Sequence, residues 1–170
     1  NLFMVDSYRR QPATHFVPAV HEGSAVLMAH GYAQVTGDVG VATVTHGPAL
    51  TNCITALTDA ARAKVGIVLM AGDTPVSHPA HLQNTDQRAV ATLCGAGLEQ
   101  MRSSATALDD LARSLYRARA EQRPILFNMP AEFMWDDVDY RKTVCPVFDT
   151  PAYAPKGDVL DEAIGMIASA

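Results

Sequence analysis

The chain has 170 residues, of which 48% are apolar and 18% are charged. This composition suits one domain of ordinary size with its own apolar core. The formal net charge is -5 and the 13 Lys and Arg residues are scattered, so a basic surface for nucleic acid is excluded. We also expect no membrane segment, because no apolar run reaches the roughly 18 residues that a membrane-spanning helix needs.

The three cysteines lie far apart along the chain, at Cys53, Cys94 and Cys145. Their odd number and wide spacing fit neither a disulfide framework nor a Cys-x-x-Cys metal site. The first residues, moreover, lack the charged start and cleavage site of a signal peptide. We therefore expect a reducing, cytoplasmic compartment.

Runs of apolar residues alternate between helical and strand-like spacing along the chain. In chain order, helices are predicted at 2–10, 22–36, 51–64 and 105–121, and strands at 15–20, 39–45, 66–72 and 124–130. Gly37 stands where a helix C-cap is expected, and residues 73–85, rich in Pro, His and Thr, are predicted to form a loop. Strands alternating with helices predict an α/β fold with three layers, a central parallel sheet covered on both faces. The strand that should precede the first helix is missing, so we expect this chain to lack the first strand of the sheet.

The pattern changes after Pro130, where Trp135 is followed by two aspartates and then by several prolines. We expect one domain at 1–135, a linker at 136–156, and the start of a missing middle domain at 157–170. Trp135 is expected to pack at the end of the first domain. The first residue is Asn1, so the sequence looks like an excerpt from a longer chain.

Glu22 is the candidate for chemistry, because it stands at the point where a predicted strand ends and a helix begins. The helix N-terminus favours its anion by about 0.3–1 kcal/mol, while apolar neighbours would raise its pKa. A carboxylate balanced in this way can exchange a proton. The alternative is that Glu22 is only a first-turn acid that complements the helix dipole.

Two further features follow predicted strands, the turn from His46 through Gly47 to Pro48 and the segment that begins at Asp73. In parallel sheets, ligands bind beyond the carboxyl ends of the strands. We therefore expect these features to converge with Glu22 at one edge. His78 and His81 in the following loop have no third partner at metal-ligand spacing, so we interpret both as solvated loop residues.

Several motifs, taken in order, point to a known family. They are His21-Glu22, Gly31-Tyr32-Ala33, Thr36-Gly37, VATVTHGPALTN at 41–52, AGDTP at 71–75, and the strand that runs from Arg123-Pro124 to Pro130. With this order and spacing, residues 2–135 resemble the N-terminal, pyrimidine-binding domain of thiamine-diphosphate-dependent enzymes, in particular the acetolactate synthase and 2-oxoacid decarboxylase group.

The resemblance implies a role for each matching residue. Glu22 would bind N1′ of the cofactor's aminopyrimidine and promote its imino tautomer. Gly47 and Pro48 would form the turn that lets backbone approach the cofactor. Asn52 would hold that turn or contact the ligand, or would only cap the chain locally. Three more residues are expected on the substrate side: His46, Asp73 and Gln83. His46 could donate or accept a proton there, or it could simply be a histidine of the turn.

The resemblance also implies partners. It implies a 2-oxoacid substrate, thiamine diphosphate, Mg²⁺ held by a separate domain, and possible FAD in a middle domain. It further implies a homodimer or homotetramer whose active site lies between subunits. Alternatives are a separate subunit of a split 2-oxoacid decarboxylase, and a non-catalytic module that kept the fold.

The sequence departs from the acetolactate synthase pattern near the substrate end. Gly23 and Asp73 each stand where glutamine is usual, and the turn reads Gly-Pro-Ala where Gly-Pro-Gly is common. A lysine expected within residues 94–100 is absent. Activation of the cofactor is therefore better supported than synthesis of acetolactate.

Overall fold

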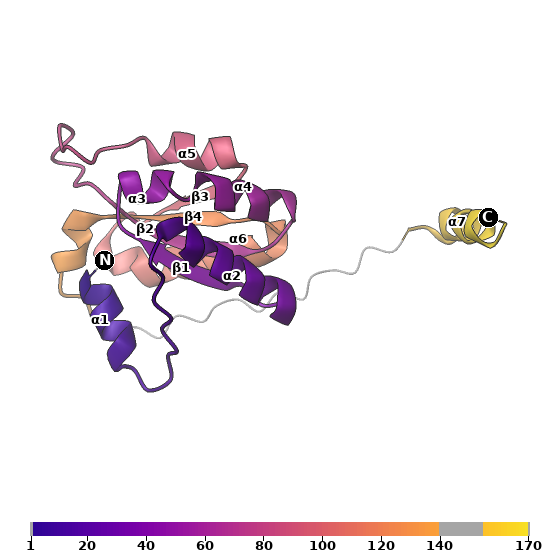
Figure 1. Cartoon of the computed structure of the whole chain (residues 1–170), viewed down its shortest axis with the longest axis horizontal. Helices are drawn as coiled ribbons and strands as arrows, with labels where there is room; N and C mark the ends of the chain where they lie inside the picture. Colours follow the sequence, from indigo (N-terminus) through magenta and orange to yellow (C-terminus); the bar gives the residue numbers. More distant parts are fainter. Residues whose placement is uncertain (1, 140–154, 170) are drawn as a thin grey trace.

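Four parallel strands form the centre of the computed structural model, which describes residues 2–139 and 155–169. They are β1 (Gly40–Val44), β2 (Ile67–Asp73), β3 (Gly97–Gln100) and β4 (Ile125–Pro130), in the spatial order β1-β2-β4-β3. Every neighbouring pair is parallel, so the carboxyl ends of the strands meet at one edge (Figure 1). At that edge Asp73 pairs with Pro130, and Gln100 pairs with Asn128.

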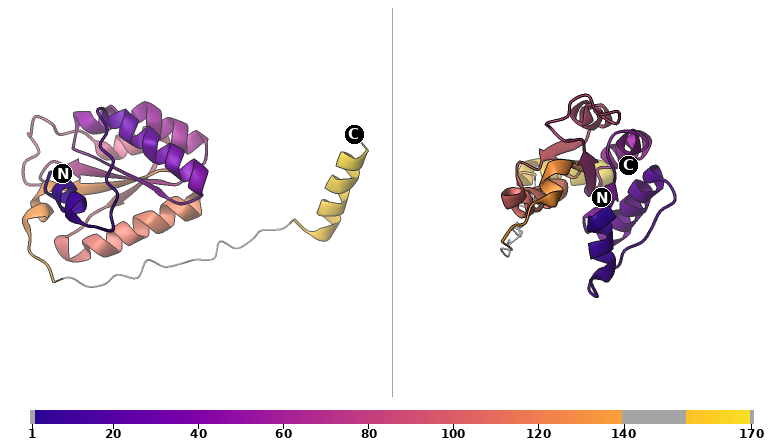
Figure 2. Two further views of the ribbon diagram at one scale, coloured as in Figure 1. Left: turned by 60° about the horizontal axis from the view of Figure 1, so that its bottom comes forward. Right: turned by 90° about the vertical axis from the view of Figure 1, so that its left-hand side faces the viewer.

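Helices cover both faces of this sheet (Figure 2). One face carries α2 (Glu22–Thr36), α4 (Ile54–Arg62) and α5 (Gln87–Cys94), and the opposite face carries α1 (Leu2–Arg10) and α6 (Ala107–Glu121). Shorter helices are α3 (Pro48–Thr51), η1 (Ser104–Thr106) and η2 (Ala131–Trp135), and α7 (Gly157–Ala168) has no buried residue. The predicted α/β/α architecture is confirmed.

The two central strands show why the sheet needs both layers. Every residue of β4, and every residue of β2 except Asp73, is buried. Successive side chains of β2 alternate between two cores: Ile67 and Leu69 pack toward α2 and α4, whereas Val68 and Met70 pack toward α6. Continuous apolar runs of this kind are typical of parallel strands that are covered on both faces.

The strand predicted at 15–20 does not form. This segment makes no ladder with any described strand, and its side chains are exposed except for Phe16, which is half-buried. Pro18 has no backbone N–H to donate, and apolar residues alone do not make a strand without a neighbour that accepts its hydrogen bonds. Glu22 therefore does not follow a sheet strand, although it does begin α2 as predicted.

Other elements differ from the prediction in their number and bounds. The helix predicted at 51–64 is two helices, because α3 begins at Pro48 and the chain bends at Asn52 before α4. The sequence analysis missed α5 and β3, whose eight and four residues are too short to show a clear period. Gly37 is confirmed as a C-cap, with a φ of 76°.

The buried face of α2 is narrower than the helical spacing suggests. Val26, Ala29 and Ala33 are buried as expected, but Met28 and Tyr32 are 44% and 55% exposed. Trp135 is also exposed, although its ring meets that of Phe3 edge to face with centroids 5.2 Å apart.

An ion-pair chain, defined here by seven charged residues, links α6 to the loops on either side of it and to β3. Its centre is Asp110, which is fully buried and is paired with Arg102 at 2.7 Å and with Arg113. The remaining members are Glu99, Arg117, Glu121 and Arg123. Burial acts to raise the pKa of Asp110, but hydrogen bonds from Arg102, Thr106 and Arg113 outweigh it and lower the pKa.

Cys53 and Cys94 are buried free thiols. Burial, with the negative charge of Glu22 nearby, raises the pKa of Cys53 to about 12, and burial raises that of Cys94. Both are therefore protonated at neutral pH, while Cys145 lies outside the described residues. Across residues 2–139 and 155–169, no helix is both long and apolar enough to span a membrane.

Candidate active site

Glu22 begins α2, and its carboxylate is held from another element. The helix is capped by His21, whose Nδ1 accepts the backbone N–H of Gly23 at 3.1 Å. Oε2 of Glu22 accepts a hydrogen bond from Nδ2 of Asn52 at 3.1 Å, thirty residues further along the chain. The side chain of Asn52 therefore binds Glu22, a contact that the sequence analysis did not predict.

The electrostatics of Glu22 differ from the prediction. Its own backbone N–H and then the Asn52 amide bind the carboxylate, and both lower its pKa below the ordinary value. Desolvation acts in the opposite direction but is smaller, because the side chain is only half-buried. In this chain Glu22 is an anion at neutral pH, and the apolar neighbours that were expected to raise its pKa do not enclose it.

Close backbone packing brings the start of α2 against the turn after β1. A Cβ on Gly23 would lie 3.1 Å from the backbone oxygen of Asn52. Gly47 has a φ of 61° and a ψ of -114°, a backbone conformation that residues other than glycine rarely adopt. A Cβ on Gly47 would also lie 2.2 Å from the backbone oxygen of Gln83. The turn at 46–48 therefore has a physical need for glycine, and Gln83 touches it through its backbone while its side chain is exposed.

We expect Gly47→Ala to lower the free energy of unfolding by about 1–3 kcal/mol, because alanine must adopt a strained backbone and displace the loop at Gln83. Urea denaturation of the intact protein measures this. Gly31→Ala is the matched control, since its Cβ would meet nothing within 4 Å and alanine favours a helix by up to about 1 kcal/mol. Equal free energies of unfolding for the two variants would show that the turn does not require glycine at position 47.

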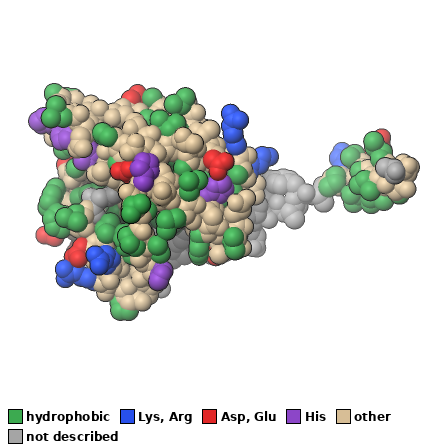
Figure 3. Space-filling view, viewed as in Figure 1, with side chains coloured by type: hydrophobic (Ala, Val, Ile, Leu, Met, Phe, Trp, Pro, Cys, Tyr) green, Lys and Arg blue, Asp and Glu red, His purple; other side chains and the backbone are tan. Residues whose placement is uncertain are grey.

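Histidines gather near the same edge of the sheet (Figure 3). The ring of His46 lies 5.5 Å from that of His81, which lies 5.8 Å from that of His78. Nδ1 of His46 is 3.2 Å from the Thr45 hydroxyl, and its Nε2 is buried and has no hydrogen-bond partner within residues 2–139 and 155–169. Among the described residues, no group of three or more His, Cys, Asp or Glu side chains is arranged to hold a metal ion.

Asp73 ends β2 and is joined to polar groups of neighbouring strands. Its Oδ1 accepts the backbone N–H of Thr74 at 2.7 Å, and its Oδ2 accepts a hydrogen bond from Nδ2 of Asn128 at 2.7 Å. Gln87 and Gln100 also bond to Asn128. The sequence analysis missed Asn128 and Gln87, although a lone amide inside the apolar run PILFNMP is a signal, because a buried polar side chain requires partners.

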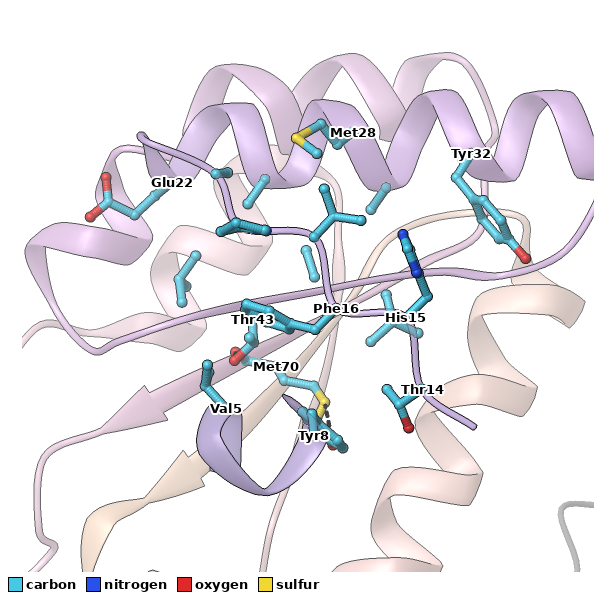
Figure 4. Close-up of a pocket in the computed structure, with 18 of the residues that line it drawn as sticks. Val5, Tyr8, Thr14, His15, Phe16, Glu22, Met28, Tyr32, Thr43 and Met70 are labelled. Carbon is cyan, nitrogen blue, oxygen red and sulfur yellow. Dashed lines mark hydrogen bonds between the residues drawn. The ribbon is translucent and has the colours of Figure 1, made fainter. Parts of the chain in front are cut away.

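A cavity of about 1280 Å³ lies between residues 14–22, α1, α2 and β1 (Figure 4). Phe16, Val44 and Met70 contribute to its mainly apolar lining, together with the exposed Met28 and Tyr32 of α2. Glu22 is at the rim of this space, and its carboxylate points away from the middle of it (Figure 4). The predicted polar residues of the strand ends therefore lie outside the large cavity.

The residues at this edge fit a flat, polar ligand that needs a carboxylate and close backbone approach. In the part of the chain that the structure describes, the side-chain hydrogen bond from Asn52 reaches only Oε2 of Glu22 and leaves the other carboxylate oxygen for a ligand. The glycine turn beside it presents backbone without a Cβ. These are the features that the sequence resemblance assigns to the pyrimidine side of thiamine diphosphate.

Comparisons with known proteins agree with this fit. The family model described as "Thiamine pyrophosphate enzyme, N-terminal TPP binding domain" matches residues 1–92. The chain is 32% identical over 145 residues to 2-hydroxyacyl-CoA lyase 2 of Bos taurus, which covers 81% of this chain and 21% of the relative. It is 32% identical over 142 residues to acetolactate synthase of Mycobacterium leprae, covering 79% of this chain and 22% of the relative.

A solved structure shows the same fold. The crystal structure of benzoylformate decarboxylase from Polynucleobacter necessarius matches with a TM-score of 0.78 at 17% identity, over 92% of this chain and 30% of that one. The chain thus spans about a fifth to a third of the length of the relatives it matches. From the family match over residues 1–92, we conclude that this chain belongs to the thiamine pyrophosphate enzymes and carries their N-terminal, thiamine-pyrophosphate-binding domain.

Proposed function

We propose that this chain is the pyrimidine-binding part of a thiamine-diphosphate-dependent decarboxylase or carboligase that acts on a 2-oxoacid, similar to acetolactate synthase. The observation that carries the proposal is the Glu22 carboxylate, held by Asn52 at 3.1 Å beside the Gly47 turn. The first domain would end near residue 135 and be followed by a linker to residue 156 and then by a middle domain.

Glu22 would bind the aminopyrimidine ring through its free oxygen, while Asn52 fixes the other. When bound, thiamine diphosphate supplies the group that takes up the electrons released as a 2-oxoacid loses carbon dioxide. The chain's part is to hold a proton at the carboxylate of Glu22. A second subunit covering Glu22 would remove it from water and raise its pKa toward the range in which a carboxyl group exchanges protons at neutral pH.

Other residues of the edge would serve the substrate side. His46, with a buried and unpartnered Nε2, would donate or accept a proton there. Asp73 and Gln83 would face the 2-oxoacid or its acceptor, and Gly47 and Pro48 would form the backbone wall. Mg²⁺ would be held by a separate domain, as would FAD if the enzyme carries it, and the active site would lie between the subunits of a homodimer or homotetramer in the cytoplasm.

Thermal unfolding of the intact protein with Mg²⁺ and thiamine diphosphate tests this proposal. A ligand at 100 times its Kd stabilises the native state by about 2.7 kcal/mol, so Tm should rise by several degrees. Mg²⁺ with ADP is the matched control for a diphosphate that lacks the pyrimidine and thiazolium rings. No shift with thiamine diphosphate would favour the alternative of a non-catalytic module, and a shift only after a second polypeptide is added would favour a split enzyme.

A further inference from the structure

Three amide side chains form a hydrogen-bonded cluster near the carboxyl ends of β2, β3 and β4, and one of them, Asn128, binds Asp73. We call Gln87, Gln100 and Asn128 the amide cluster. Gln87 and Asn128 are 3% exposed, and Gln100 is half-buried. The cluster therefore connects α5 and the ends of three strands through hydrogen bonds that are largely shielded from water.

The directions of these hydrogen bonds are determined by their partners. Nε2 of Gln87 donates to the backbone oxygen of Gly72 at 2.8 Å and to Oδ1 of Asn128 at 2.7 Å. Nδ2 of Asn128 then donates to Oδ2 of Asp73 at 2.7 Å and to Oε1 of Gln100 at 2.9 Å. Both side-chain N–H groups of Asn128 are used, and one of them is directed at the carboxylate.

The orientation of the Gln87 amide leaves one of its atoms unsatisfied. Its Oε1 is buried and has no hydrogen-bond partner among the described residues, and an unmade bond of this kind costs about 1–3 kcal/mol. Turning the amide over would place its oxygen against the two oxygens that it now serves, at Gly72 and Asn128. These two acceptors therefore set the orientation of the Gln87 amide, and its N–H group in turn orients Oδ1 of Asn128 toward α5.

Asp73 is the end point of the cluster and stands at the open edge. One donor meets each of its oxygens, Thr74 on Oδ1 and Asn128 on Oδ2, so each oxygen keeps a lone pair for a further donor. A Cβ on the preceding Gly72 would lie 3.7 Å from Nδ1 of His46, so Asp73 follows a backbone position that adjoins the candidate site.

We propose that the amide cluster positions the Asp73 carboxylate as a hydrogen-bond acceptor for a donor group on the substrate. Asn128 and Gln87 are positioning residues in this assignment, since they act through Asp73. The inference rests on the proposed function. It adds that the side of the substrate next to β2 carries a hydrogen-bond donor, because the acceptor there is a carboxylate whose orientation is set from within the protein.

Exchanging the side chains of Asp73 and Asn128 distinguishes a positioning role of the amide cluster from a purely structural one. Asn128→Asp alone places two carboxylates 2.7 Å apart in place of the present hydrogen bond, and should lower Tm by about 5 °C or more. In the double variant Asp73→Asn with Asn128→Asp, the amide introduced at position 73 would donate to the new carboxylate at position 128. Gln87 would still donate to that carboxylate, and Gln100 could rotate its amide to do so. The swap should therefore recover at least half of the lost Tm while moving the carboxylate away from the edge.

The experiment uses the intact protein with Mg²⁺, thiamine diphosphate and three 2-oxoacid probes. 3-Hydroxypyruvate carries a hydroxyl that can donate a hydrogen bond, whereas pyruvate and 2-oxobutanoate carry no donor at neutral pH. We expect the wild type to show a lower KM for 3-hydroxypyruvate than for pyruvate. The swapped variant should raise the KM for 3-hydroxypyruvate at least tenfold, with Tm largely restored. Gln34→Glu, an amide-to-acid change at an exposed position, is the control and should leave both values unchanged.

Recovery of KM and kcat together with Tm in the swapped variant would overturn the inference, because the cluster would then be structural only. Failure to recover any Tm would also overturn it, since the hydrogen bonds would not be exchangeable as described. A wild-type protein that binds no thiamine diphosphate and consumes none of the probes would instead overturn the proposed function, and this result needs no variant.

Discussion

Glu22→Gln is expected to lower kcat of the intact enzyme by about 10²–10⁴-fold with little change in stability. Glutamine has the same shape, and its Oε1 can still accept the hydrogen bond from Asn52. It cannot hold and release a proton, which is the role we propose for the carboxylate. Because Glu22 is only half-buried, water screens its charge, so Tm should move little.

Turnover with the best of the three 2-oxoacids and thermal unfolding should be measured on the same samples. Asn52→Ala is the second variant to measure, because it removes the amide that orients Glu22 but keeps the carboxylate. We expect it to lower kcat less than Glu22→Gln does. If Glu22→Gln turned over at the wild-type rate, the carboxylate would have no role in the chemistry and the proposed function would fail.

Asp110→Asn is expected to lower the free energy of unfolding by about 3 kcal/mol, since it breaks a buried ion pair and weakens its hydrogen bonds. Asp110 is fully buried, but the side chains of Arg102 and Arg113 are 62% and 38% exposed. These arginines can turn to water after the change, so the loss should lie at the lower end of values for broken buried pairs.

Urea denaturation at about pH 7 measures this loss, and Asp38→Asn, at an exposed position, should stay within about 0.5 kcal/mol of wild type. The pKa of Asp110 is lowered in the folded state from its ordinary value of 3.8. The charged Asp110 therefore contributes its full share of the free energy of unfolding above pH 3.8. This contribution is lost as the pH falls through the lower pKa of the folded state. The stability difference between wild type and Asp110→Asn should shrink on acidification below 3.8; a constant difference would show that charge is not its source.

The sequence alone predicted those structural features that depend on a single residue type or on the spacing of apolar residues. The helix at 22–36 ends at Gly37, whose φ of 76° requires a residue that tolerates the left-handed region. The apolar runs around β2 and β4 predicted buried parallel strands, because both faces of each strand must be apolar. The turn at Gly47 was likewise predicted, but the hydrogen bond between Glu22 and Asn52 was not.

Tertiary structure decided what depends on partners distant in the chain. Residues 15–20 are apolar enough for a strand but have no described neighbour to pair with, whereas the four residues of β3 form one because β4 lies beside them. The pKa of Glu22 is lowered first by its own backbone N–H and then by an amide thirty residues away, while its carboxylate stays close to water. Asn128 acquires its role from α5, β2 and β3 together. The sequence by itself thus determined the layers, the turns and the family, while hydrogen bonding between distant segments set the edge strand and the chemistry of the site, because such bonds exist only once the chain has folded.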